Sequence, residues 1–406
     1  MNVINTNDLR PGQMFSEPVF TEGKNMLVPA NFPLRQKDID LLVSWGIDVV
    51  KTEGNLLEEE QIDDTLLNNK KEESAEKTAM GIPSVPKKPV KKETIKFSIS
   101  DVRQNSGSYR AYKNLIEKLN SVFSGLKTRL DVEMRAIDNI SVLLLQDLRD
   151  YPDSFVGFIL GGEVSGNELA KSSVNTAILS ALTAYELKLP NHKINNIVSG
   201  ALLHDVGMLR LSKGITEKKG GLSEAELEQI KSHPLHSSKI VQKELFGSHE
   251  VNLIAMQHHE RWDGQGYPDK LTGAAIDIGA RIVSAADAFE AMVSKKSYRN
   301  SLSGYQAVKN LLADNARRFD PAVIMAFTKV MGIYPIGSIV RLNDESIARV
   351  VNVHTDAPVR PVIQILMDKR GKVISPGDVP TIDLLSEKTL FIKQAIDPGE
   401  FEESNE

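Results

Sequence analysis

The chain has 406 residues, of which 41% are apolar and 25% are charged, with a formal net charge of -5 and no cysteine. This length exceeds what one hydrophobic core usually organises, so we expect two or three domains of an ordinary globular protein. The acidic net charge argues against a DNA-binding protein, and the lack of cysteine excludes disulfides and thiolate metal sites.

The first part of the chain predicts a small module followed by a linker. Residues 1–54 alternate short β-favouring runs (LRPGQMF, the run at 18–20, MLVPA) with turns and then show a helical pattern in QKDIDLLVSWGIDVV, which predicts an α+β module. Residues 55–98 are rich in Glu, Asp, Lys and Pro, which predicts a charged, flexible linker. The N-terminus resembles no signal peptide, and no apolar run approaches the roughly 18 residues of a membrane span. We therefore expect a cytoplasmic protein.

Residues 99–334 are predicted to form an all-helical domain, and residues 335–406 a small antiparallel β extension with a tail. Apolar residues recur at helical spacing from Tyr112 to Leu148, a stripe that could mediate homodimerisation or simply form core. A second apolar stripe ends at His204 and Asp205, which places this pair at a helix end. Ser223 and Glu226 form a capping-box signature for a helix that leads to His233. After Pro335 the runs SIVRL, IARVVNV and PVIQILM indicate strands.

Histidines and aspartates form the most informative pattern of the helical region. A single histidine or aspartate here is more often a hydrogen-bonded structural residue than a metal ligand. Imidazole and carboxylate together are, however, the groups that bind divalent Mn, Fe or Zn, and a carboxylate can bridge two ions. His192, His236, His249 and His354 lack this context and are interpreted as surface or structural residues. The set interpreted as candidate ligands is His204, Asp205, His233, His258, His259 and Asp287.

Several ordered motifs resemble those of one family. The segments HDVG at 204–207, KSHP at 231–234, HHERWDGQGYP at 258–268, and ARIVSAADAFEAM followed by SYR up to Arg299 resemble the HD-GYP family of cyclic di-GMP phosphodiesterases. The resemblance spans roughly residues 168–308. The segments before and after it resemble modules that accompany such domains.

This resemblance implies a mainly α protein with an HD-type domain that holds two or three divalent ions, iron or manganese. It implies that His204, Asp205 and Asp287 hold one ion, that Asp205, His233 and His258 hold a second, and that Glu168 and His259 complete a further position. His204 and Asp205 would form the catalytic pair. Gly266, Tyr267 and Pro268 would contact substrate, although DGQGYP could also be a plain turn. Lys296 and Arg299 would contact phosphate, although exposed basic residues are more often only solvated.

Two positions depart from the family pattern. Ser172 stands where the first helix of the family carries a histidine, and Met208 stands where a lysine usually contacts the substrate phosphate. A hydroxyl is a poor substitute for imidazole, and a thioether supplies no charge.

Three functional hypotheses therefore stay open. The first is a metal-dependent enzyme that hydrolyses cyclic di-GMP to linear pGpG, GMP or both by means of an activated water. The second is a catalytically degenerate domain that acts as a cyclic di-GMP receptor or protein-interaction module. The third, less favoured, is another HD-type nucleotide phosphohydrolase. A diguanylate cyclase of the GGDEF type, or another signalling protein, is a candidate partner.

Overall fold

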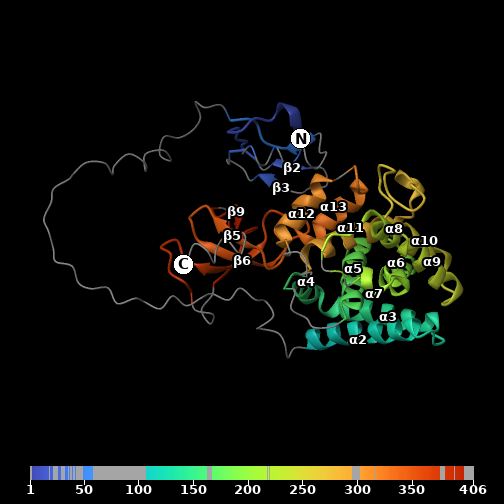
Figure 1. Cartoon of the computed structure of the whole chain (residues 1–406). Coiled ribbons are helices and arrows are strands. Elements are labelled where there is room, and N and C mark those ends of the chain that lie inside the picture. Colours follow the sequence, from blue (N-terminus) through green and yellow to red (C-terminus); the bar gives the residue numbers. More distant parts are fainter. Residues whose placement is uncertain are drawn as a thin grey trace. The chain divides into compact units, whose positions relative to one another are not determined.

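The computed structural model describes most of the chain outside the predicted linker. The described residues are 2–17, 19–21, 26–28, 33–34, 36, 39, 42, 49–57, 107–161, 167–216, 218, 220–294, 302–314, 316–374, 380–387 and 389–396. Nearly all of the linker predicted at 55–98, and both Lys296 and Arg299, lie outside this set. The chain divides into two compact units, residues 1–97 with 399–406, and residues 98–398. Figure 1 colours the chain along the sequence, from blue at the N-terminus to red at the C-terminus.

The N-terminal unit contains a four-stranded antiparallel sheet in the order β1-β4-β2-β3. Its strands are β1 (Asn2–Asn5), β2 (Val19–Thr21), β3 (Met26–Val28) and β4 (Val49–Thr52), and a short 3-10 turn, η1, covers Thr6–Asp8. Two details of the sequence prediction were wrong. Val49 and Val50 end the helical pattern but lie in β4, as suits two adjacent β-branched residues. LRPGQMF forms no strand, since only Phe15 makes an isolated bridge.

The second unit is mainly helical, as predicted. Its helical elements are α2 (Gly107–Lys127), α3 (Met134–Asp150), α4 (Pro152–Gly161), α5 (Glu168–Glu186), α6 (Asn191–Leu203), η6 (Val206–Arg210), α7 (Lys213–Thr216), α8 (Glu224–Lys231), α9 (His233–Lys243), α10 (His249–Gln257), η7 (Gly273–Ala275), α11 (Ile278–Val293), α12 (Gly304–Ala313) and α13 (Pro321–Met331).

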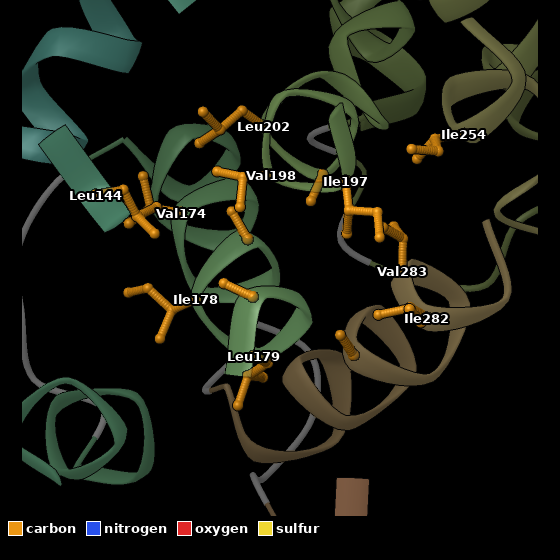
Figure 2. Close-up of a cluster of buried hydrophobic side chains, with 14 of the residues drawn as sticks. Leu144, Val174, Ile178, Leu179, Ile197, Val198, Leu202, Ile254, Ile282 and Val283 are labelled. Atoms are coloured by element: carbon orange, nitrogen blue, oxygen red, sulfur yellow. The ribbon is translucent and has the colours of Figure 1, made fainter. Parts of the chain in front are cut away.

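Helix α5 lies at the centre of this unit. Its residues are buried from Ala170 to Ala181, and it packs against α2, α6, α11 and α13. Figure 2 shows Val174, Ile178 and Leu179 of α5 near apolar side chains of α6 and α11. Small residues dominate α5, which lets neighbouring helices approach closely on every side. The apolar stripe that begins at Tyr112 is buried in the same core, so it forms ordinary core within this chain.

The helix ends that carry the histidines follow local rules. α6 ends at Leu203 with His204 as its C-cap, and α8 begins with the predicted capping box between Ser223 and Glu226. Pro234 stands in the first turn of α9, where its missing N–H costs nothing. These helix ends agree with the sequence prediction.

The C-terminal part of the second unit is a five-stranded antiparallel sheet in the order β8-β7-β6-β5-β9. The three predicted runs form β5 (Ile339–Leu342), β6 (Ile347–Asn352) and β7 (Val362–Met367). Sequence reasoning missed β8 (Thr381–Asp383) and β9 (Ile392–Ile396), because both are short and β9 (IKQAI) does not alternate strictly between apolar and polar residues. Within the described part of the chain, no helix is long and apolar enough to cross a membrane.

Candidate metal centre

The His204–Asp205 pair sits where the chain leaves α6 and turns back against α9. The Gly207 N–H donates to Ser237 Oγ at 2.8 Å, and that hydroxyl donates to the His204 carbonyl oxygen at 2.6 Å. A Cβ atom at position 207 would lie 2.1 Å from the His233 carbonyl oxygen. Glycine is therefore required here, because this close approach brings Asp205 beside His233.

Three separate elements supply the four remaining candidate ligands. His233 is the first residue of α9, His258 is the C-cap of α10 with His259 directly after it, and Asp287 lies in α11. The structure brings these residues together with His204 and Asp205. One group combines Asp205, His233, His258 and His259, and the other combines His204, Asp205 and Asp287.

Backbone contacts orient three of the imidazoles. The Nδ1 atoms of His204, His233 and His258 lie 2.7, 2.7 and 3.0 Å from the carbonyl oxygens of Ala201, Ile230 and Ala255, each three residues earlier. A carbonyl oxygen only accepts, so Nδ1 carries the proton and Nε2 of the neutral ring presents a lone pair. This is the tautomer that a metal ion requires at Nε2.

The two oxygens of the Asp205 carboxylate face different groups. Oδ1 lies 3.0 Å from His233 Nε2 and 3.8 Å from His258 Nε2, whereas Oδ2 lies 3.5 Å from His204 Nε2. Asp287 Oδ1 also lies 3.5 Å from His204 Nε2. Because Asp205 belongs to both groups, it has the arrangement of a carboxylate that bridges two ions.

The donor atoms fit divalent metal ions. His204 Nε2 is fully buried and has no hydrogen-bond partner, although two carboxylates face it at 3.5 Å. His233 Nε2 and His258 Nε2 lie 3.1 Å apart, and when both rings are neutral with the proton on Nδ1, neither Nε2 can donate to the other. A divalent ion would relieve both situations, because imidazole nitrogens bind such ions at about 2.1 Å. The side chains of Asp205 and Asp287 are 23% and 18% exposed, so the site also opens to solvent.

The electrostatic surroundings keep the Asp205 carboxylate ionised and the His259 imidazole neutral. Burial disfavours the charge of Asp205, but the nearby His204, His233 and His258 outweigh it and hold the Asp205 pKa well below its usual value. Burial and the neighbouring His258 lower the His259 pKa well below its usual value. Burial alone would lower the His204 pKa, yet Asp205 and Asp287 raise it to about 9. Positive charge is thus favoured between these carboxylates, where a metal ion would compete with the proton.

The glycine-rich loop is fixed beside the histidines. Buried Glu260 accepts the backbone N–H groups of Asp269 and Leu271 at 2.6 and 3.0 Å. The Tyr267 ring stacks on His259 with centroids 4.8 Å apart. A Cβ at Gly266 would lie 2.4 Å from the Arg261 nitrogen, so only glycine fits this turn. Sequence reasoning missed Glu260, although it directly follows the two histidines.

The positions that depart from the family pattern have defined surroundings. The Ser172 hydroxyl donates to Glu290 Oε2 at 2.7 Å, and Asn175 Nδ2 donates to Glu290 Oε1 at 3.0 Å. Ser172 thus belongs to a buried polar network that sequence reasoning did not anticipate. Met208 lies in η6 and is partly buried. Glu168 begins α5 and is exposed; it is in neither metal-ligand group of the described residues.

Metal removal is expected to destabilise the protein, because the buried imidazoles and carboxylates of the centre lose the ion that binds them together. At a free metal concentration 100 times the Kd, bound metal stabilises by about 2.7 kcal/mol. For a unit of this size we expect chelation to lower Tm by roughly 8 °C. Differential scanning fluorimetry with and without chelator measures this shift, and re-addition of manganese should reverse it. An unchanged Tm in protein shown to have lost its metal would contradict this expectation.

Comparisons with known proteins identify the family of this chain. An HD domain family model matches residues 164–323, and a model described as a KOW domain associated with HD domain matches residues 339–404. A cyclic di-GMP phosphodiesterase of Borreliella burgdorferi is 30% identical over 298 residues, which cover 73% of this chain and 78% of that protein.

Two further relatives match shorter stretches. A cyclic di-GMP phosphodiesterase of Pseudomonas aeruginosa is 30% identical over 207 residues, covering 51% of this chain and 50% of that protein. A 3'3'-cGAMP-specific phosphodiesterase of Vibrio cholerae is 29% identical over 186 residues, covering 45% and 36%. With the HD and GYP motifs present and the match to the Borreliella protein spanning most of both chains, this chain belongs to the HD-GYP family of HD-domain proteins.

Proposed function

We propose that the protein is a metal-dependent phosphodiesterase that hydrolyses cyclic di-GMP to linear pGpG, GMP or both. The observation that carries this proposal is the Asp205 carboxylate, whose two oxygens face two separate groups of metal-binding side chains. Relatives named as cyclic di-GMP phosphodiesterases support the substrate class.

Each residue of the centre has a proposed role. His204, Asp205 and Asp287 would hold one divalent ion, and Asp205, His233 and His258 a second, with His259 beside the second group. Iron or manganese suits this set of nitrogen and oxygen donors. Such ions lower the pKa of water and neutralise charge that builds up on a phosphoryl group. The buried imidazoles hold the ions in place, while the partly exposed carboxylates leave access for substrate.

Substrate contacts are proposed for the loop beside the centre. Tyr267 and Gly266 line a cavity of about 800 Å³ that His259 also lines, and Pro268 completes this wall. That volume lies within the usual range for small-molecule sites. Lys296 and Arg299 stay predictions as phosphate contacts, as does Glu168 as a metal ligand.

A second candidate function is a receptor for cyclic di-GMP that has lost catalysis. It is favoured by Ser172, whose hydroxyl is committed to Glu290, and by Met208, which offers no cation to a phosphate. A related dinucleotide is a second candidate ligand, because one relative is named as specific for 3'3'-cGAMP.

Metal analysis of anaerobically purified protein, together with chromatography of the products, tests these functions. We expect about two ions per chain and conversion of cyclic di-GMP to a linear product, since both ligand groups are assembled. Parallel reactions with 3'3'-cGAMP and with nucleotide monoesters define specificity. Ser172→His and Met208→Lys serve as comparison variants. Metal and dinucleotide binding with turnover only in these variants would instead identify a receptor.

A further inference from the structure

The cavity beside the metal centre contains more positive charge than the glycine-rich loop alone supplies. It reaches the centre through His259 and Tyr267, and its lining also includes Arg318, which lies just before α13. No sequence motif pointed to Arg318. Its burial is intermediate, so its side chain is accessible from the cavity.

Most charged groups of this cavity are already neutralised by close partners. Lys231 Nζ lies 2.6 Å from Glu228 Oε1, and Arg261 pairs with Asp263 at 2.7 Å. Glu260 is committed to the loop amides described above. Among the described residues, no acidic side chain forms an ion pair with Arg318 or with Lys270, which also lines the cavity. Arg318 and Lys270 can therefore pair with an anion that binds in this cavity.

The backbone around Arg318 is hydrogen-bonded to the glycine-rich loop. The Trp262 N–H donates to the Arg318 carbonyl oxygen at 3.0 Å, and the Asp263 N–H donates to the Arg317 carbonyl oxygen at 2.9 Å. The Arg318 guanidinium carbon lies 4.9 Å from the centre of the Phe319 ring. Arg318 and Tyr267 both line this cavity, and the Tyr267 ring stacks on His259. The guanidinium is therefore held close to the wall that reaches the metal ligands.

We propose that Arg318 binds a phosphate of the cyclic dinucleotide, an inference that rests on the function proposed above. A cyclic dinucleotide carries two phosphodiesters. The metal centre would take one, and the second needs a cation that Met208 cannot supply. A guanidinium presents two parallel N–H donors that match phosphate oxygens, and it stays charged at every physiological pH. Arg318, in the segment before α13, thus supplies the positive charge that Met208 lacks.

Binding and kinetics of manganese-loaded protein test this role. We expect Arg318→Ala to raise the KM for cyclic di-GMP roughly 10- to 100-fold with kcat changed less than about threefold, since the lost contact is a charge-assisted hydrogen bond. Arg318→Lys should recover part of the loss. Hydrolysis of bis(p-nitrophenyl) phosphate, which has one phosphate only, should stay within about threefold, because the metal centre is unchanged.

Arg317→Ala is the matched control, because Arg317 is the adjacent arginine but its side chain is 71% exposed and pairs with Asp314. This control should bind and hydrolyse as the unaltered protein does. Equal KM values for the unaltered protein and Arg318→Ala would overturn the role of Arg318.

A phosphorothioate analogue of cyclic di-GMP that resists hydrolysis separates this inference from the proposed enzyme activity. Suppose that the unaltered protein binds the analogue but does not hydrolyse cyclic di-GMP, and that Arg318→Ala binds the analogue at least 10-fold more weakly. The phosphate contact would then be supported and the proposed enzyme activity would be wrong. Equal affinities in both proteins overturn the contact alone. Absence of binding by the unaltered protein overturns both.

Discussion

Replacing Asp205 by alanine is expected to abolish hydrolysis of cyclic di-GMP and to remove at least one bound metal ion. Both groups of ligands share this carboxylate, with Oδ1 3.0 Å from His233 Nε2 and Oδ2 3.5 Å from His204 Nε2. Its loss leaves buried imidazoles without the negative charge that balances two cations. We expect kcat to fall on the order of 10³-fold or more. Metal analysis and single-turnover kinetics measure the two effects separately.

The control for this variant is Asp356→Ala, which removes an exposed aspartate of the C-terminal part of the chain. It should retain both metal and activity. Asp205→Asn adds a further comparison, because it preserves size and one oxygen but removes the charge. If Asp205→Ala kept its metal and turned over cyclic di-GMP at the unaltered rate, Asp205 would not bridge the ions and the proposed centre would be wrong.

Replacing Gly207 by alanine is expected to destabilise the second unit and to displace the HD pair. The added methyl group would lie 2.1 Å from the His233 carbonyl oxygen and 2.6 Å from the Ser237 nitrogen, both of which belong to backbone that cannot rotate away. We expect a loss of about 3 kcal/mol in the free energy of unfolding, because η6 must move away from α9. Since that movement separates Asp205 from His233, metal affinity should fall as well.

Urea unfolding of metal-free protein measures the stability change without the contribution of metal. Gly214→Ala is the matched control, because Gly214 lies in the nearby helix α7 and has no atom within 4 Å of an added Cβ. That variant should be as stable as the unaltered protein or slightly more stable. Equal stabilities for the Gly207 and Gly214 variants would show that the close approach to α9 does not affect the free energy of unfolding.

The buried network around Glu290 explains how the fold accommodates the departure at position 172. Glu290 lies three residues after Asp287 on α11 and is only 1% exposed. It accepts hydrogen bonds from Ser172, Asn175 and Ser294, and Asn175 in turn accepts one from the Tyr112 hydroxyl. A buried carboxylate needs such partners. The serine is therefore a hydrogen-bonding member of the α5–α11 interface.

Local sequence rules were sufficient for the helix ends that carry the ligands. An apolar stripe that stops at Leu203, a capping box at Ser223 and a proline at position 234 act within one or two turns of the chain, so they can be recognised without the fold. Motif spacing added the six His and Asp residues that the structure brings together. The sequence alone therefore determined the helical class of the central region and which side chains gather there.

Only the tertiary structure decided the arrangement of those side chains. Three contacts join elements that are distant in sequence: the two Asp205 oxygens face different histidines, His233 Nε2 lies 3.1 Å from His258 Nε2, and the Ser172 hydroxyl donates to Glu290. The same holds for Arg318, which reaches the cavity through backbone pairing with the loop at residues 262–263. Such contacts depend on how helices pack, and periodicity along one helix carries no information about its partners.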